Sequence, residues 1–460
     1  MPVAVSLMLP YLFGLGVLLS FLCASIMDGA VVAEDTDRGQ RFATCLVFGL
    51  LLNHSLALLL SDLKSSLVVG CSLSVAALIV LAAVQRRRLR KVISVQWLFL
   101  SFVLYLACLY VVLAEPLDGW DARSIWFFHG KMIFYNASID AGGDWTLSSI
   151  GFSHTDYPEM VPILAAQIAS VAGYWNEYLP KMSLVALLFP ALLLLFSIFG
   201  GKSWQTVFIA VPLLFTGVWL KNGYMDGYLA LYGGLAAFYL GRWLDNANRM
   251  DLVSGVLATG VVLDLKNEGM LYALIVTALL CSFLLSKRIR HAAQQSVRLR
   301  EDLPLLIVAL SGWVLWERKK QLFHLKNDLQ LGFSSLETLL HRLSEGSLAL
   351  ILKSLYVTYD VNLSLGIFLL SLVWSVRKGR RPGRGALFCA LVAILYFAGI
   401  VMIYLATPFD LVSFHLPTGN RTMLPVHMVL LAASLSLFQL NGSPTGVSGS
   451  ASRAAGPAPL

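Results

Sequence analysis

Residues 115–162 read EPLDGWDARSIWFFHGKMIFYNASIDAGGDWTLSSIGFSHTDYPEMVP, a polar and aromatic segment in an otherwise strongly apolar chain. The segment carries several acids, Arg123, Lys131 and many Trp and Tyr side chains. Loops of this length are usually functional or disordered, and the aromatic content argues against disorder. We therefore expect the rest of the chain to hold this segment in place.

The chain around this segment has the composition of an integral membrane protein. Of its 460 residues, 58% are hydrophobic and 13% are charged, and the mean hydropathy is +0.74. Crossing a membrane takes about 20 apolar residues, and the apolar runs suffice for about 13 transmembrane helices. We therefore predict an all-α polytopic membrane protein surrounded by membrane lipids.

The formal net charge of +8 does not indicate a nucleic-acid partner. The basic residues fall in short blocks between apolar runs, which is typical of cytoplasmic membrane loops. Three blocks are predicted to be cytoplasmic: 85–91, 287–300 and 377–384. The same topology places three loops outside: 115–158, 318–347 and 407–421. It also requires the apolar run at 159–173 to lie along the outer interface instead of crossing.

The predicted topology divides the chain into three parts. Residues 1–92 are transmembrane helices, 93–440 form a larger transmembrane module, and 441–460 are a disordered tail rich in Gly, Ser, Ala and Pro. All six Cys lie within apolar runs, so we expect no disulfide. No ligand spacing specifies a metal site, so we predict no cofactor and leave a metal requirement open.

Four polar clusters fall on the outer side in this topology: 115–158, 221–226, 264–268 and 410–421. Ionisable residues near membrane depth are costly, so those retained are functional candidates. Each cluster also has a structural alternative. Asp226 can begin a helix, and Arg421 can anchor at the interface. Lys266 and Glu268 can form a solvated turn. Four clusters on one side nevertheless favour a binding site.

Five short motifs lie in these clusters. They are Trp120-Asp121-Ala122 with Trp126 and Lys131, His154-Thr155-Asp156-Tyr157-Pro158, GYMDGYL at 223–229, LKNEG at 265–269, and YLATPFDL at 404–411 with Arg421. Together they resemble the GT-C superfamily of membrane glycosyltransferases, in particular its bacterial members.

The resemblance implies that 93–440 is a GT-C-like catalytic module whose first large outer loop supplies the catalytic acid. It implies a sugar donor on a polyprenyl phosphate and an acceptor that is a lipid, a glycan or a protein. For a bacterial member it implies the inner membrane, with the active site on the periplasmic face. Two features depart from the family. Three spans instead of one precede the loop, and the loop has no adjacent pair of acids, which leaves the identity of the base open.

Transfer from a lipid phosphate needs a carboxylate that deprotonates the acceptor hydroxyl as it attacks the anomeric carbon. Asp118 and Asp121 are the candidates in the first loop. We favour Asp121 because it lies beside Trp120 in an apolar setting. The structural alternative is that Asp121 caps a helix over 122–128, as Asp does well.

The leaving group is a phosphate, which cations must hold. The candidate cations are Arg421, Lys266 and Arg123, with Arg favoured for its bidentate geometry. The other residues predicted to line the substrate site are Lys131, His154, Asp156, Tyr157, Asp226, Glu268, Asp410 and His415.

Two other functions stay open at this point. An enzyme of the O-antigen ligase or polymerase type also uses a lipid-linked donor, but it usually carries its large outer loop late in the chain. A non-enzymatic transporter would have charged residues in the middle of spans, whereas most charges here lie at span ends. A site above the bilayer favours transfer, and a midplane site favours transport.

Overall fold

The computed structural model describes residues 2–22, 34–84, 95–199, 216–287, 289, 297–325, 333–356 and 359–439. In these ranges the regular elements are all helices, which confirms the all-α prediction. Outside the described residues lie the predicted tail at 441–460 and the basic block at 85–91, and partly outside lie the basic block at 287–300 and the outer loop at 318–347.

Sixteen of the described helices have ten or more residues and the α geometry. They are α1 (Pro2–Leu22), α3 (Glu34–Leu60), α4 (Leu63–Val84), α6 (Val95–Leu113), α7 (Phe127–Asn136), α8 (Met160–Ala172), α9 (Met182–Ile198), α11 (Asp226–Asn246), α12 (Arg249–Leu263), α13 (Glu268–Leu284), α15 (Leu299–Leu322), α16 (Phe333–Ser344), α17 (Ser347–Tyr356), α18 (Tyr359–Arg377), α19 (Arg384–Ala406) and α21 (Leu424–Gln439). Three short elements also matter for the site: η1 (Ala122–Trp126), η6 (Leu411–His415) and α20 (Gly419–Thr422).

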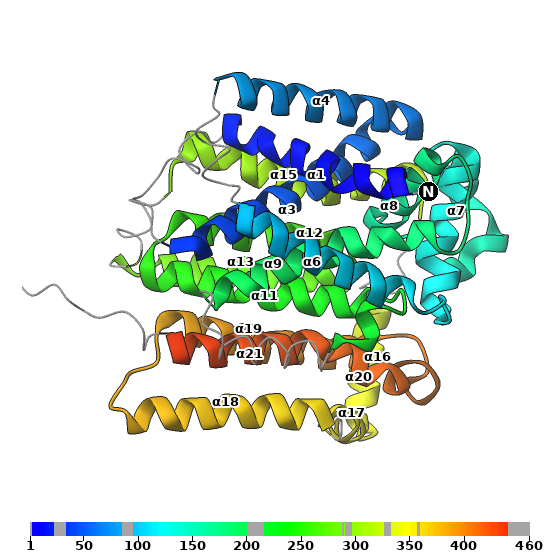
Figure 1. The fold of residues 1–460 in the computed structure, drawn as a ribbon. Coiled ribbons are helices and arrows are strands. Elements are labelled where there is room, and N and C mark those ends of the chain that lie inside the picture. Colours follow the sequence, from blue (N-terminus) through cyan, green and yellow to red (C-terminus); the bar gives the residue numbers. More distant parts are fainter. Residues whose placement is uncertain are drawn as a thin grey trace, which may run out of the picture.

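The long helices lie roughly along one direction (Figure 1). Helix α11 packs against α12 and α21, α3 packs against α1, α9 and α15, and α18 packs on α21. The short helices α7, α16, α17 and α20 gather at one end of this bundle, which we call the loop end (Figure 1). Segments far apart in the sequence therefore meet at the loop end.

Five helical stretches in the described part of the chain are long and apolar enough to cross a membrane. They are Arg38–Leu60, Leu63–Ala83, Leu179–Ile198, Arg384–Ala406 and Leu411–Phe438. The shorter apolar helices are Met8–Leu19, Ser101–Leu113, Met160–Ala172, Glu268–Leu284 and Asn362–Arg377. These helices are compatible with an integral membrane protein, and the number of about 13 spans stays a prediction.

Helix α8 occupies the run at 159–173 that was expected not to cross. Its 13 residues extend for about 20 Å, which is too short to cross a bilayer. It differs from an interfacial helix because residues 160–169 are buried and α8 packs against α7 and α9. Its polar residue Gln167 is also satisfied inside the protein, where its amide exchanges hydrogen bonds with the amide of Asn53. Helix α8 thus anchors the end of the polar segment within the bundle.

Helix α15 ends at Leu322, so the outer loop predicted to start at 318 begins inside this helix. Residues 318–320 are all basic, although the loop is predicted to lie outside and basic residues are typical of cytoplasmic loops. Lys319 resolves this, because its ammonium pairs with Asp140 and donates to Ser61 Oγ at 2.7 Å. The charge of Lys319 is therefore neutralised by the polar segment.

Helix α16 is amphipathic, with leucines at helical spacing. Leu336, Leu340 and Leu343 are exposed, whereas Leu339 packs against the core. Arg342, on the same helix, donates to the backbone oxygens of Tyr404 and Phe409, each at 2.6 Å. The helix is fixed to the end of α19 by its polar side and leaves an apolar strip uncovered, as an interfacial helix would.

Candidate functional site

Five ionisable side chains meet at the loop end, and we call them the charge cluster: Asp121, Asp226, Lys266, Glu268 and Arg421. They come from four segments of the chain. Asp121 precedes η1, Asp226 begins α11, and Arg421 lies in α20. Lys266 lies in the turn between α12 and α13, and Glu268 is the first residue of α13.

The charge cluster is held by direct ion pairs. Arg421 Nη1 lies 2.6 Å from Asp121 Oδ2 and 3.8 Å from Asp226 Oδ2. Lys266 Nζ lies 3.0 Å from Asp226 Oδ1 and 3.1 Å from Glu268 Oε1. Asp226 is thus the central acid, placed between the two cations.

The close approach of two segments positions Asp121 near Arg421. Gly119 lies against the ring of Tyr224, where a Cβ atom would come within 2.0 Å of a ring carbon. Gly223 has a φ of +86°, which favours glycine, and a Cβ atom there would come within 2.6 Å of Ala122 Cβ. The Arg421 guanidinium then lies 4.9 Å from the centroid of the Tyr224 ring, a cation–π contact.

A buried turn positions Lys266. Gly269 allows the turn to close tightly, because a Cβ atom at this position would lie 1.9 Å from the backbone oxygen of Val262. Asp264, which ends α12, pairs with His54 of α3, with Nδ1 and Oδ2 3.0 Å apart and both side chains buried. The turn is therefore anchored in the bundle on one side while it presents Lys266 to the charge cluster on the other.

The electrostatics of Lys266 and Asp226 favour the charged forms of both. Burial lowers the pKa of Lys266, but Asp226 and Glu268 more than offset this and the pKa lies well above its usual range. Burial raises the pKa of Asp226, but Lys266 and Arg421 more than offset this and the pKa lies below its usual range. These two side chains form an ionised pair at neutral pH.

The charge cluster has an inner pair and three outer members. The side chains of Asp226 and Lys266 are 5% and 6% exposed, whereas those of Asp121, Arg421 and Glu268 are 13%, 18% and 22% exposed. Among the described residues, Asp226 Oδ2 and Glu268 Oε2 accept no hydrogen bond. The partial exposure of the three outer members leaves the cluster able to contact a further polar group.

Asp226 begins α11, as its structural alternative predicted, but the alternatives for Asp121, Arg421 and Lys266 do not describe those residues. Asp121 makes no capping hydrogen bond, because its carboxylate faces Arg421 instead. Arg421 is paired and stacked, which is not the geometry of a free interface anchor. Lys266 is buried, so the turn that carries it is not a solvated one. The charges are held against one another at a cost that a simple loop would avoid.

Three other predicted residues adjoin the charge cluster. Asp156 Oδ2 accepts a hydrogen bond of 2.6 Å from Asn267, the residue between Lys266 and Glu268. Tyr157 stacks between Trp126 and His154, with ring centroids 5.5 and 5.3 Å away. Burial raises the pKa of Tyr157, and the nearby carboxylate of Glu268 adds to this effect. The end of the polar segment therefore forms one wall of the site.

The remaining predicted residues lie outside the charge cluster. Asp118 and Arg123 are exposed, and Lys131 pairs with Glu177 at the surface, 2.7 Å away. Asp410 caps η6 by accepting from the backbone of Ser413 at 2.7 Å. His415 Nε2 lies 2.9 Å from Thr407 Oγ1. Sequence proximity to Arg421 suggested a site role for Asp410 and His415, but local hydrogen bonds account for their positions.

A buried relay in the polar segment was not predicted. His129 Nδ1 lies 2.7 Å from Glu159 Oε1, and its Nε2 lies 3.1 Å from Ser153 Oγ. All three side chains are fully buried. The relay ties α7 to the start of α8, so it holds the polar segment folded. Nothing in the sequence indicated that Tyr224 and His54 support the charge cluster. Their roles depend on contacts between segments that are far apart in the chain.

Metal binding is not indicated by the spacing of ligands. Over the residues that the structure describes, no group of three or more His, Cys, Asp and Glu side chains is arranged to hold a metal ion. The metal requirement therefore stays open.

Comparison with known proteins adds no family: no protein-family model, no curated protein and no solved structure matches this chain. The resemblance to the GT-C superfamily stays a prediction that rests on the motifs alone.

Proposed function

We propose that this chain is a membrane glycosyltransferase that moves a sugar from a polyprenyl-phosphate donor to a lipid, glycan or protein acceptor at the loop end. The observation that carries the proposal is the pairing of Asp121 with Arg421. The acid expected to act as base and the cation expected to hold the phosphate come from opposite ends of the chain, yet they are in contact.

Charge balance gives this pairing a role in the reaction. The charge cluster has three acids and two cations, so its formal charge is −1 when all five are ionised. A donor phosphate needs a cation, and Arg421 is the more exposed of the two. When Arg421 turns to the phosphate, Asp121 loses its counter-ion and becomes a stronger base. Donor binding would thus prepare the base for the acceptor.

The transfer step then uses the three outer members of the charge cluster together with Lys266. Asp121 takes the proton of the acceptor hydroxyl while the acceptor oxygen bonds to the anomeric carbon. The bond from that carbon to the phosphate oxygen breaks, and its electron pair stays on the departing polyprenyl phosphate. Arg421 and Lys266 stabilise the negative charge that develops there. Glu268, the most exposed member at 22%, would accept a hydrogen bond from a sugar hydroxyl.

The proposal places the loop end on the outer face of the membrane, the periplasmic face in a bacterial inner membrane. Its test compares the surface glycans and lipid-linked sugars of cells with and without the chain. We expect one glycan to lose a sugar and the corresponding lipid-linked donor to accumulate in cells that lack it. Restoring the gene should reverse both changes. Identical glycans and identical donor pools in the two strains would exclude this function.

An O-antigen ligase or polymerase type enzyme predicts a different result in the same experiment. Such an enzyme moves an assembled glycan, so its loss would leave whole glycan chains on the lipid carrier instead of single sugars. The mass of the accumulated lipid separates the two enzyme classes.

A transporter is the second candidate, favoured by the buried pair of His54 and Asp264. His54 belongs to the candidate span Arg38–Leu60, and both side chains are almost fully buried. Ionisable residues within a span often mark a transport pathway. Purified protein in liposomes that moves a lipid-linked sugar across the bilayer without transferring it would support this candidate and contradict the first.

A further inference from the structure

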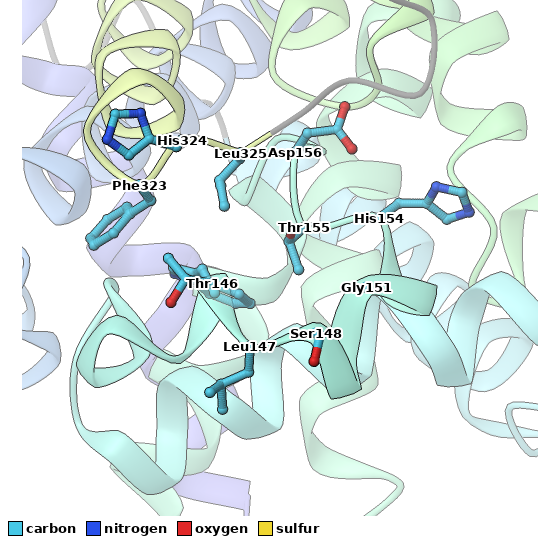
Figure 2. Close-up of a pocket in the computed structure, with 11 residues that line it drawn as sticks. Thr146, Leu147, Ser148, Gly151, His154, Thr155, Asp156, Phe323, His324 and Leu325 are labelled. Carbon is cyan, nitrogen blue, oxygen red and sulfur yellow. The ribbon is translucent and has the colours of Figure 1, made fainter.

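A cavity of about 480 Å³ opens at the loop end, between the polar segment and the end of α15 (Figure 2). The polar segment contributes Thr146, Ser148 and Thr155 to its lining. The chain just beyond α15 contributes Phe323, His324 and Leu325. The volume lies within the range of about 300–1,000 Å³ that is typical of small-molecule sites.

The cavity is not part of the charge cluster. Asp156 contributes to the lining, but its carboxylate points away from the cavity, toward Asn267 (Figure 2). The ring of His154 also points away, and stacks on Tyr157 (Figure 2). The segment that carries these residues is therefore a wall with the cavity on one face and the charge cluster on the other.

The cavity presents unused polar groups but no free charge. Within the described residues, the side chains of Ser148, Thr155 and His324 make no hydrogen bond. Apolar surface from Phe323 and Leu325 lies next to these groups (Figure 2). The nearby cation Lys319 is already paired with Asp140.

We propose that this cavity binds a neutral saccharide unit. An anionic ligand would find no free cation among the lining residues, and a purely apolar ligand would remove water from the Ser148 and Thr155 hydroxyls without replacing its hydrogen bonds. A sugar ring has hydroxyls for these groups and an apolar face for Phe323. Because the cavity shares a wall with the charge cluster, it suits a second unit of the acceptor. This selects a glycan among the possible acceptors, and that last step rests on the proposed function.

Gly151 provides a variant that fills the cavity. It lines the cavity, and a Cβ atom added to it meets nothing within 4 Å. The Gly151→Phe variant should therefore fold and occupy the space meant for the ligand. Gly366 of α18, where an added Cβ atom also meets nothing within 4 Å, gives the matched control Gly366→Phe. A second variant, Ser148→Ala with Thr155→Val, keeps the space open but removes both hydroxyls.

The measurement is saturation-transfer NMR on the full-length protein in detergent. The probes are the neutral methyl glycosides of glucose, galactose, mannose and N-acetylglucosamine, with glucuronate and the tripeptide Gly-Ser-Gly for comparison. We expect at least one glycoside to bind the wild type and the Gly366→Phe control. Its affinity should fall at least about tenfold in Gly151→Phe and in the double variant, since two hydrogen bonds are lost in the latter.

Three results would overturn the inference: no glycoside binds, a glycoside binds Gly151→Phe as well as the wild type, or the tripeptide binds in the cavity in place of the sugars. The binding readout is independent of transfer. Saccharide binding without any transferase activity would therefore reject the proposed function and retain the cavity as a sugar site. Transferase activity without saccharide binding would retain the proposed function and reject the cavity as a sugar site.

Discussion

Arg421 Nη1 lies 2.6 Å from Asp121 Oδ2, although the two residues are 300 positions apart. The contact joins the first polar segment of the chain to α20, at the start of the last helix pair. It also links the two proposed roles, phosphate binding by Arg421 and proton abstraction by Asp121. A phosphate that draws Arg421 away leaves the Asp121 carboxylate without its counter-ion. Variants of Arg421 should therefore change both donor binding and transfer, whereas variants of Asp121 should change transfer.

Arg421→Lys should weaken donor binding. Lysine keeps the positive charge but loses the planar guanidinium and its second hydrogen bond to phosphate. We expect a loss of about 1–3 kcal/mol in donor affinity, measured by titration with a polyprenyl-phosphate sugar. Arg123→Lys is the matched control, since Arg123 is exposed and outside the charge cluster. Equal donor affinity for Arg421→Lys and the wild type would remove Arg421 from the phosphate site.

Asp226→Asn should destabilise the fold, because it leaves the Lys266 ammonium buried with a weaker partner. Breaking a buried ion pair costs on the order of 3–5 kcal/mol, which thermal unfolding in detergent can detect. Replacing both residues, as Asp226→Asn with Lys266→Met, should recover part of this loss. If the loss of stability in the double variant equals the sum of the losses in the two single variants, the ion pair contributes nothing to stability.

The effect of Asp226→Asn should also depend on pH. The pKa of Asp226 is below its usual range in the folded protein, because Lys266 and Arg421 outweigh the effect of burial. Its contribution to stability is then fully present above the ordinary carboxyl pKa of about 4 and is lost as the pH falls through the folded-state pKa. The stability difference between wild type and variant should therefore be largest at neutral pH and shrink in acid.

Gly312→Ala should disturb the charge cluster from a distance. A Cβ atom at position 312 would lie 2.2 Å from Asp264 Oδ2 and 2.7 Å from His54 Nδ1. One of these side chains must move, and Asp264 is two residues from Lys266. We expect a lower melting temperature and weaker donor binding. Gly366→Ala, at an open position, should change neither. A Gly312→Ala variant with wild-type stability and donor affinity would show that the His54–Asp264 pair does not support the turn.

The predicted topology can be tested with single cysteines at Ser148 and Gly383. Ser148 begins a short helix between α7 and α8, and Gly383 directly precedes α19. Helix α7 lies at the loop end, and α19 starts at the opposite end of the bundle (Figure 1). In a background without the native cysteines, Ser148→Cys should react with a membrane-impermeant thiol reagent added outside intact cells. Gly383→Cys should react only after the membrane is permeabilised. Equal labelling from outside at both positions would refute the assignment.

The helical class and most members of the charge cluster could be predicted from the sequence. The strongly apolar composition indicates a membrane protein, and a segment that crosses lipid as a helix satisfies all its backbone hydrogen bonds internally. Ionisable residues beside apolar runs are costly to desolvate, so those that are retained are functional candidates. This made three members recognisable: Asp226, Lys266 and Glu268. Arg421 and Asp121 were recognisable from their motifs.

The pairing within the charge cluster could not be predicted, because it depends on how distant segments pack. Gly119 and Gly223 bring two loops together, and no local pattern gives their partners. Nearness in the sequence was also misleading for Asp410, which caps η6 instead of facing Arg421. The burial of α8 was missed for a similar reason, since an apolar run does not reveal whether lipid or protein surrounds it.

The central claim is that Asp121 is the base of a sugar transfer from a polyprenyl-phosphate donor. The most direct measurement compares the rate of transfer by purified wild type and by Asp121→Asn, alongside expression and donor binding. General base catalysis contributes about 10²–10⁴-fold, so we expect a loss of that size in a variant that still folds and binds the donor. Asp118→Asn, at an exposed position outside the charge cluster, should keep its activity. An Asp121→Asn variant that transfers sugar at the wild-type rate would contradict the account.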